Sequence, residues 1–167
     1  MTKYVSIDHC KEIIFPIIQR HMATGEPAPQ YMIERSGLEK VDSILHLMQG
    51  DDYYPSLSSK ASYMFCAVIG GHPFSNGNKR LAVALLANFL LLNGCGLRDE
   101  SIGELRRELQ LLFPHLQWQQ VKSFRYAYEY FLYHLPLIVA DRHQKGRMTF
   151  HEECSAVERA LDVIVHY

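Results

Sequence analysis

The chain has 167 residues, 48% of them hydrophobic, a size and composition that favour one globular domain over residues 1–167. Its 17 basic and 18 acidic residues give a formal net charge of -1, which excludes an overall field that would draw it to nucleic acid or an anionic membrane. The four cysteines are not paired in spacing and the N-terminus lacks the apolar stretch of a signal peptide, so we expect reduced thiols and a cytoplasmic protein.

The first part of the chain predicts two amphipathic helices joined by a connector. Isoleucines recur at helical spacing over residues 7–18, which indicates a first helix with Pro16 as a candidate bend. The stretch 25–30 contains two prolines and a glycine and cannot continue that helix. Apolar residues spaced along 38–48 then predict a second helix.

A turn-rich segment separates the second helix from a third. Residues 50–58 read GDDYYPSLS, a mixture of turn formers and two tyrosines that predicts an exposed loop or a short β-hairpin. The third helix is expected from Ser58 to Ile69, with Gly70-Gly71 as its C-terminal stop.

Residues 78–93 are apolar on nearly every side, which predicts a central helix buried among others. The run 81–92 is interrupted by Asn88 and is too short to cross a bilayer, so no membrane association is expected. The fold class is therefore an all-α, compact bundle around this helix.

Three more helices are expected in the C-terminal region 99–167. Their ranges are 101–113, 118–135 and 152–165, separated by Pro114, by Pro136 and by a basic turn at 142–147. Aromatic residues between 118 and 133 have helical spacing, which favours core packing over the alternative of a partner surface.

The segment between the third helix and the central helix carries candidate chemistry. Residues 70–83 read GGHPFSNGNKRLAV. Gly77 relaxes the backbone, and Asn76 or Asn78 can cap the next helix, whose free amides and dipole favour an anion such as phosphate.

Two cations follow at the start of that helix. Lys79 and Arg80 face the positive end of the helix dipole, a position that a bound polyphosphate would make favourable. The alternative is that both side chains bend outward into water.

His72 lies just before the loop, and imidazole is the usual side chain for taking a proton from a hydroxyl near neutral pH. Phe74 is expected to anchor the loop in the core. The nine histidines show no spacing typical of zinc sites, and the scattered basic residues give little support to nucleic-acid binding.

The stretch His72–Arg80, HPFSNGNKR, closely resembles the signature loop of the Fic/Doc (Fido) family, His-x-Phe-x-Asp/Glu/Asn-Gly/Ala-Asn-Gly/Lys-Arg. The resemblance extends less tightly over 36–97. It implies a Fido-type helical domain and an enzyme that transfers AMP, or in the Doc branch a phosphate, from ATP to a hydroxyl group of a target protein.

In such an enzyme His72 would act as the base, with Mg²⁺ neutralising charge on ATP. Residues 76–80 (Asn76, Gly77, Asn78, Lys79 and Arg80) would hold the phosphates, and 50–58 would be the flap that aligns the target. AMP-transferring members usually have glycine at position 79 and arginine at position 83, so Lys79 and Val83 resemble the Doc branch and favour phosphate transfer.

Two further features bear on activity and control. Asn76 stands where an acidic metal ligand is usual, and an amide is a weaker Mg²⁺ ligand than a carboxylate. The inhibitory pattern of many AMP-transferring relatives is absent, since Thr149–Glu153 matches only its spacing, so a toxin of this type would need a separate antitoxin protein.

Two other functions stay open at this point. Asn76 is also compatible with a protein that binds nucleotide without turnover. A helical interaction module without a ligand is the third hypothesis.

Overall fold

The computed structural model describes residues 1–22, 26–27, 29–98, 101–113, 124–145 and 148–166. Its helices are α1 (Ile7–His9), η1 (Cys10–Ile14), α2 (Phe15–His21), η2 (Tyr31–Ile33), α3 (Arg35–Leu47), α4 (Leu57–Gly71), α5 (Asn78–Leu92), α6 (Ile102–Leu112), α7 (Ala127–Lys145) and α8 (Phe150–Ile164). The all-α fold class is confirmed, because the described strands are only two short segments, β1 (Gly96–Leu97) and β2 (Val165–His166).

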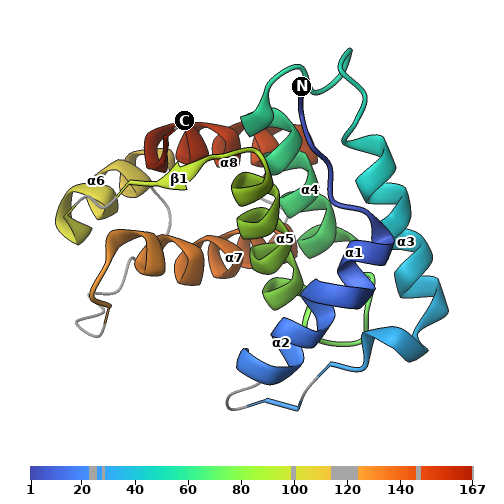
Figure 1. Cartoon of the computed structure of the whole chain (residues 1–167). Coiled ribbons are helices and arrows are strands. Elements are labelled where there is room, and N and C mark those ends of the chain that lie inside the picture. Colours follow the sequence, from blue (N-terminus) through green and yellow to red (C-terminus); the bar gives the residue numbers. More distant parts are fainter. Residues whose placement is uncertain (23–25, 28, 99–100, 114–123, 146–147, 167) are drawn as a thin grey trace.

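Two adjacent helices form the centre of the molecule. α5 packs against α4, α7 and α2, while α4 also packs along α8 (Figure 1). Eleven of the fifteen residues of α4 and eight of the fifteen residues of α5 are buried. The expected buried helix at 78–93 is therefore present as α5, and α4 is enclosed even more completely.

The first helix is not simply bent at Pro16. Pro16 lies in the first turn of α2, directly after the wide π-helical turn η1. Proline has no amide hydrogen to donate to the preceding turn, and a π-helical turn is a known way to absorb such a break.

The segment 50–58 is neither a β-hairpin nor placed to act as a flap beside the signature stretch 72–80, which we call the motif loop. It forms turns at the N-terminal end of α4 (Figure 1). His72 follows the C-terminal end of that helix, which fifteen helical residues place about 22 Å away. The buried Lys60 ammonium holds this segment by donating to the Asp51 carboxylate at 2.7 Å and to the Met48 carbonyl at 3.4 Å. The prediction that 50–58 is a flap is wrong.

The C-terminal boundaries also differ from the prediction. α7 begins at Ala127, passes through Pro136 and continues to Lys145, so 142–145 are helical rather than a turn. Residues 114–123 and 146–147 lie outside the described residues. Burial of the neighbouring Leu135 and Val139 against the core supports α7 across the hydrogen bond that Pro136 cannot make.

The described cysteines are free thiols, and three of the four are buried. Burial raises the pKa of the Cys10 thiol to about 12 and raises the pKa of the Cys66 thiol well above its usual range. Within the described ranges, no helix combines the length and apolar character needed to cross a membrane.

Candidate functional site

Asn78, the first residue of α5, closes the motif loop. Its Oδ1 accepts a hydrogen bond from the Phe74 amide at 3.0 Å, and its Nδ2 donates to the Phe74 carbonyl at 2.7 Å. Only 7% of Asn78 is exposed. The structure thus gives this amide a loop-closing contact, in addition to any contact with a ligand.

Neither expected cap is formed at the start of α5. The N-cap residue is Gly77 with φ 76°, and no side chain caps the helix. Asn78 faces back to Phe74 instead, and Asn76 is exposed. The first amide groups of α5 are therefore left without a side-chain acceptor, which is the arrangement that favours a bound anion.

Phe74 is buried and fixes the loop to the core. Its ring packs edge-on against Tyr31 at 4.8 Å and against Phe15 at 6.0 Å between ring centroids. A Cβ added at Gly37 of α3 would lie 2.5 Å from the same ring, so the close approach of α3 requires glycine there.

The connector before α3 is also part of the site. The Tyr31 hydroxyl donates to the Gly77 carbonyl at 2.9 Å, and the Glu34 carboxylate accepts from the Ser75 amide at 2.9 Å and the Ser75 hydroxyl at 2.6 Å. A Cβ at Gly77 would lie 2.4 Å from Pro29. These residues were missed from the sequence because they lie some forty positions from the loop.

Burial raises the pKa of the Tyr31 hydroxyl, although the nearby Arg80 charge acts in the opposite direction. The hydroxyl therefore remains a hydrogen-bond donor to Gly77 throughout the physiological range. The loop shape is correspondingly insensitive to pH at this contact.

His72 ends α4 in the left-handed region, with φ 42° and ψ 60°. Gly70 and Gly71, the expected stop, both remain helical. The helix ends at His72 because Pro73 follows it, and a residue that precedes proline is disfavoured in the right-handed α conformation. A non-glycine residue in this region carries strain, of the kind that tends to gather at functional sites, and His72 is exposed there.

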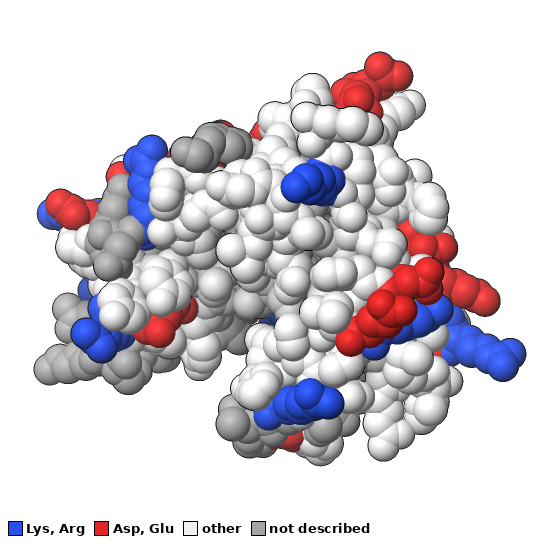
Figure 2. Space-filling view, in the orientation of Figure 1, with Lys and Arg blue, Asp and Glu red and all other residues white. Residues whose placement is uncertain are grey.

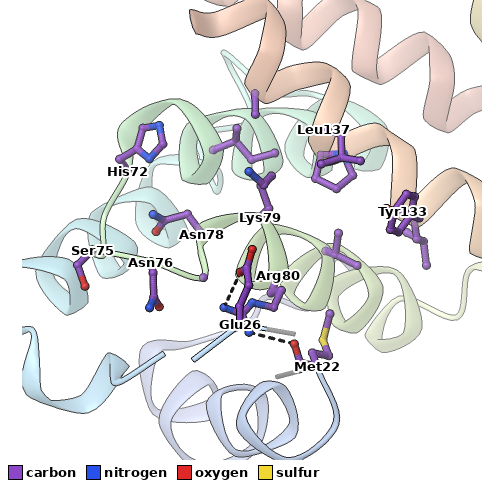
Figure 3. Close-up of a pocket in the computed structure, with 16 residues that line it drawn as sticks. Met22, Glu26, His72, Ser75, Asn76, Asn78, Lys79, Arg80, Tyr133 and Leu137 are labelled. Carbon is purple, nitrogen blue, oxygen red and sulfur yellow. Dashed lines mark hydrogen bonds and ion pairs between the residues drawn. The ribbon is translucent and has the colours of Figure 1, made fainter. Parts of the chain in front are cut away.

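The two cations that follow have different surroundings. The Arg80 guanidinium donates to the Met22 carbonyl at 3.0 Å and lies 3.3 Å from the Glu26 carboxylate, with 14% of its side chain exposed. Lys79 is exposed and reaches toward the open space beside the loop (Figure 3). Of the two, Lys79 is the cation directly available to an incoming anion.

These groups share one pocket of about 820 Å³, a volume typical of small-molecule sites. One side is polar and comes from the motif loop and the start of α5, and the other is apolar and comes from α7 (Figure 3). The lining residues among the predicted site positions are His72, Asn76, Gly77, Asn78, Lys79 and Arg80. Phe74 lies beneath the loop rather than in the lining.

The donor groups do not make up a metal site by themselves. Asn76 lines the pocket with an amide, and Glu26 lines it with a carboxylate that already pairs with Arg80. Among the described residues, no cluster of three His, Cys, Asp or Glu side chains could hold a metal ion. Side chains of this set give Mg²⁺ a weak hold compared with several carboxylates.

Lysines and arginines are scattered over the surface shown in Figure 2, and several of them lie beside acidic residues. The described residues of this face form no continuous basic stripe of the kind that tracks a nucleic-acid backbone. Lys79 and Arg80 are the basic residues that line the pocket, among the residues described.

An exposed imidazole, an exposed lysine and a helix start without a side-chain cap face one pocket of this helical protein, an arrangement that would suit an anion. The model of the Fic/DOC family matches residues 4–90, slightly more than half of the chain, and the protein belongs to this family. The match includes the N-terminal helices, beyond the region 36–97 where the resemblance was expected. No curated protein and no solved structure gives a significant match.

Proposed function

We propose that the protein transfers a phosphate or an AMP group from ATP to a hydroxyl side chain of a target protein. The observation that carries this proposal is the shared pocket, in which His72 and Lys79 face the same space beside the uncapped start of α5. Membership of the Fic/DOC family is compatible with such a transferase.

In the proposed reaction, the phosphates of ATP bind at the α5 amides and Lys79. His72 takes the proton from the target hydroxyl, whose oxygen forms a bond to phosphorus. Attack at the γ-phosphorus breaks the bond to the leaving ADP, and attack at the α-phosphorus breaks the bond to the leaving pyrophosphate. Mg²⁺ would arrive with ATP and neutralise charge on its phosphates.

Phosphate transfer, as in the Doc branch, is the favoured form of this reaction. Position 79 carries a lysine that faces the pocket, and position 83 carries Val83, which lines the pocket with an apolar side chain. An arginine at position 83, as in AMP-transferring relatives, would add a cation to Lys79 and Arg80 there. We also propose that activity of this kind, if toxic, is restrained by a separate antitoxin protein.

The segment η2 offers a place for the target to approach. Met32 and Ile33 are exposed beside the motif loop, where Glu34 is bound to Ser75. With 50–58 at the far end of α4, we assign target alignment to this short turn instead.

The chemistry is tested with host-cell lysate and ATP labelled at either the α- or the γ-phosphate. Protein labelling from the γ position indicates phosphate transfer, and labelling from the α position indicates AMP transfer. His72→Ala should abolish labelling, while His151→Ala, an exposed histidine of α8 outside the pocket, should not. No label from either position across a range of Mg²⁺ and Mn²⁺ concentrations would refute the proposal.

The second candidate is a protein that binds nucleotide without turnover. It is favoured by the weak donor set around Asn76. This function predicts ATP binding by calorimetry without target labelling, and gain of labelling in Asn76→Asp. Turnover by the wild-type protein would rule it out.

A further inference from the structure

Two cysteines from distant parts of the chain meet where α4 packs along α8. Cys66 lies in α4 and Cys154 lies in α8, and their thiols are within hydrogen-bonding reach of each other. Cys66 is fully buried, whereas Cys154 is partly exposed. Neither thiol has a part in the chemistry proposed at the motif loop.

The register of the two helices brings these cysteines together. Near the start of α4, the Ser58 hydroxyl donates to the Asp162 carboxylate of α8 at 2.5 Å. Cys66 follows Ser58 by eight residues, and Cys154 precedes Asp162 by eight residues. Eight residues are just over two helical turns, so in two antiparallel helices both cysteines lie the same distance along the same interface.

A ring contact fixes the two helices beside the cysteines. Phe150 precedes Cys154 by four residues, and Tyr63 precedes Cys66 by three, so each ring lies about one turn from the cysteine of its own helix. The rings of Tyr63 and Phe150 pack edge-on at 6.0 Å between centroids. The two thiols are therefore held on packed helices rather than on loops.

The face of α4 that carries Cys66 is made of small side chains. Ser62 and Ser59 precede Cys66 by four and seven residues, and both are buried. The distance between two packed helices depends on the size of the side chains at the contact, so small residues here favour a close approach of α8. A disulfide needs such an approach, because its two Cα atoms are usually less than about 7 Å apart.

Their surroundings give the two thiols different roles toward an oxidant. Burial, together with the neighbouring Cys154 and Glu153, raises the pKa of the Cys66 thiol well above its usual range, so this thiol stays protonated. Cys154 is the member of the pair that solvent reaches. An oxidant meets Cys154 first, and Cys66 is placed to react with the product.

We propose that Cys66 and Cys154 form an oxidation site, at which a peroxide converts the two thiols to a disulfide between α4 and α8. Hydrogen peroxide oxidises the Cys154 thiol to a sulfenic acid and is itself reduced to water. The Cys66 sulfur then attacks the Cys154 sulfur and the S–O bond breaks. The oxygen leaves as a second water molecule with the proton that Cys66 releases.

The disulfide would join two parts of the chain that the family match separates. Cys66 lies within the matched residues 4–90, and α8 lies beyond them. A covalent link between residues this far apart in the sequence strongly restricts the unfolded chain, so the oxidised protein should be more stable than the reduced one. This inference is independent of the proposed transfer reaction.

The test treats the fully reduced, full-length chain with hydrogen peroxide, alkylates the remaining thiols and maps the peptides by mass spectrometry. We expect a linked Cys66–Cys154 peptide and a loss of about 2 Da from the intact chain, one hydrogen atom from each thiol. The midpoint of urea unfolding should rise by roughly 1 M and return to the reduced value after treatment with dithiothreitol.

Two variants serve as controls. Cys154→Ser changes the partly exposed member of the pair, and peroxide should then neither link Cys66 to another residue nor raise the urea midpoint. Cys95→Ser changes a buried cysteine outside both helices and should behave as the wild type. Because the peptide map uses the wild-type chain, the test remains decisive if a variant fails to fold.

The other outcomes would overturn the inference. They are retention of the free thiols, arrest of Cys154 as a sulfinic acid, and a disulfide from Cys154 to another cysteine or to a second chain. A linked peptide with a lowered urea midpoint would show that the bond forms only in a distorted chain, and a rise that persists in Cys154→Ser would show that it arises elsewhere. None of these results depends on whether ATP labels a target protein.

Discussion

Lys79 and Arg80 are adjacent in sequence but meet different parts of the molecule. Arg80 ties α5 to the end of α2 through the Met22 carbonyl and to the connector through Glu26. Lys79 remains exposed in the pocket. An anion that approaches the loop therefore meets Lys79 first and must compete with Glu26 for Arg80.

This difference predicts separable effects of two substitutions. Lys79→Ala should lower ATP affinity about tenfold with little change in the free energy of unfolding, because one charge-assisted contact is lost from an exposed group. Arg80→Ala should also lower the free energy of unfolding by about 1–3 kcal/mol, since it leaves a carbonyl and a carboxylate without their partner. Calorimetry and urea unfolding measure the two effects, and equal loss of stability in both variants would contradict this assignment.

His134 is expected to make the stability of the fold depend on pH. The ring is buried in α7, and its Nδ1 lies 2.8 Å from the Tyr130 carbonyl. Burial lowers its pKa below the usual 6.5, and the hydrogen bond to Tyr130 acts in the opposite direction. As the pH falls through 6.5 the unfolded chain binds a proton more readily than the folded one, so stability declines until the folded-state pKa is passed.

We therefore expect His134→Gln to make the stability less dependent on pH. The measurement is the free energy of unfolding in urea at about pH 7.5 and about pH 5.5. The wild type should lose more stability between the two than His134→Gln does. His151→Gln, which changes an exposed histidine, should behave as the wild type; a steeper dependence in His134→Gln would give the opposite sign and overturn the assignment.

At the scale of elements, Asn78 joins the start of α5 to the motif loop. Asn78 satisfies both the amide and the carbonyl of the buried Phe74. Asn88 lies in the same helix, and its Nδ2 donates to the Ala84 carbonyl at 2.8 Å. Loss of the Asn78 side chain would leave two backbone groups of Phe74 unpaired, whereas loss of the Asn88 side chain would remove one bond to a helical carbonyl.

Asn78→Ala should lower the free energy of unfolding by about 2–3 kcal/mol, because two buried backbone groups lose their partners. Asn88→Ala should cost less than about 1 kcal/mol, since it removes one bond within an existing helix. Chemical denaturation of both variants checks the comparison. Similar losses would mean that the loop keeps its shape without Asn78.

The elements that sequence reasoning located well are those set by local patterns. The dense apolar residues of α4 and α5 predict buried helices, and the observed helices begin within a residue of the expected positions. The C-terminal end of α4 lies two residues beyond the expected end at Ile69. The prediction relied on Gly70 and Gly71 as the stop, whereas the helix continues to the residue before His72-Pro73. The path of α7 through Pro136 depends on packing, which periodicity does not express.

The site was predictable only in part for a related reason. The pocket brings together the six predicted positions of the loop and the start of α5. Glu34 and Tyr31 reach that loop from 41 and 46 residues away, and Tyr133 belongs to a run interpreted mainly as core. Such pairings arise from the tertiary fold and leave no local signal in the chain.

At the scale of the whole molecule, α4 is shared between the two halves of the chain. One side packs on α5, and another packs on α8, where Ala156, Val157, Ala160, Leu161 and Ile164 are buried. The family match covers residues 4–90 and so contains α4 without α8. The matched region therefore exposes a large apolar face when isolated.

A fragment of residues 1–97 should consequently fail to fold on its own. Loss of α8 leaves Tyr63 without the Phe150 ring and Cys66 without its neighbour Cys154, and apolar burial is the dominant stabilising contribution in a chain of this size. We expect a weak near-ultraviolet circular dichroism signal and binding of a hydrophobic dye, compared with the full chain. A cooperative unfolding transition in the fragment would contradict this.

The fastening of the motif loop to residues 29–37 matters for any transplant of the site into another scaffold. Residues 72–80 moved alone would keep their sequence but not their conformation, because Phe74 would lack its contact with Tyr31 and Ser75 its hydrogen bonds to Glu34. A portable unit therefore needs at least both segments, of which only one is recognisable by its signature. A graft designed from that signature alone would copy the reactive side chains without the contacts that hold them in position.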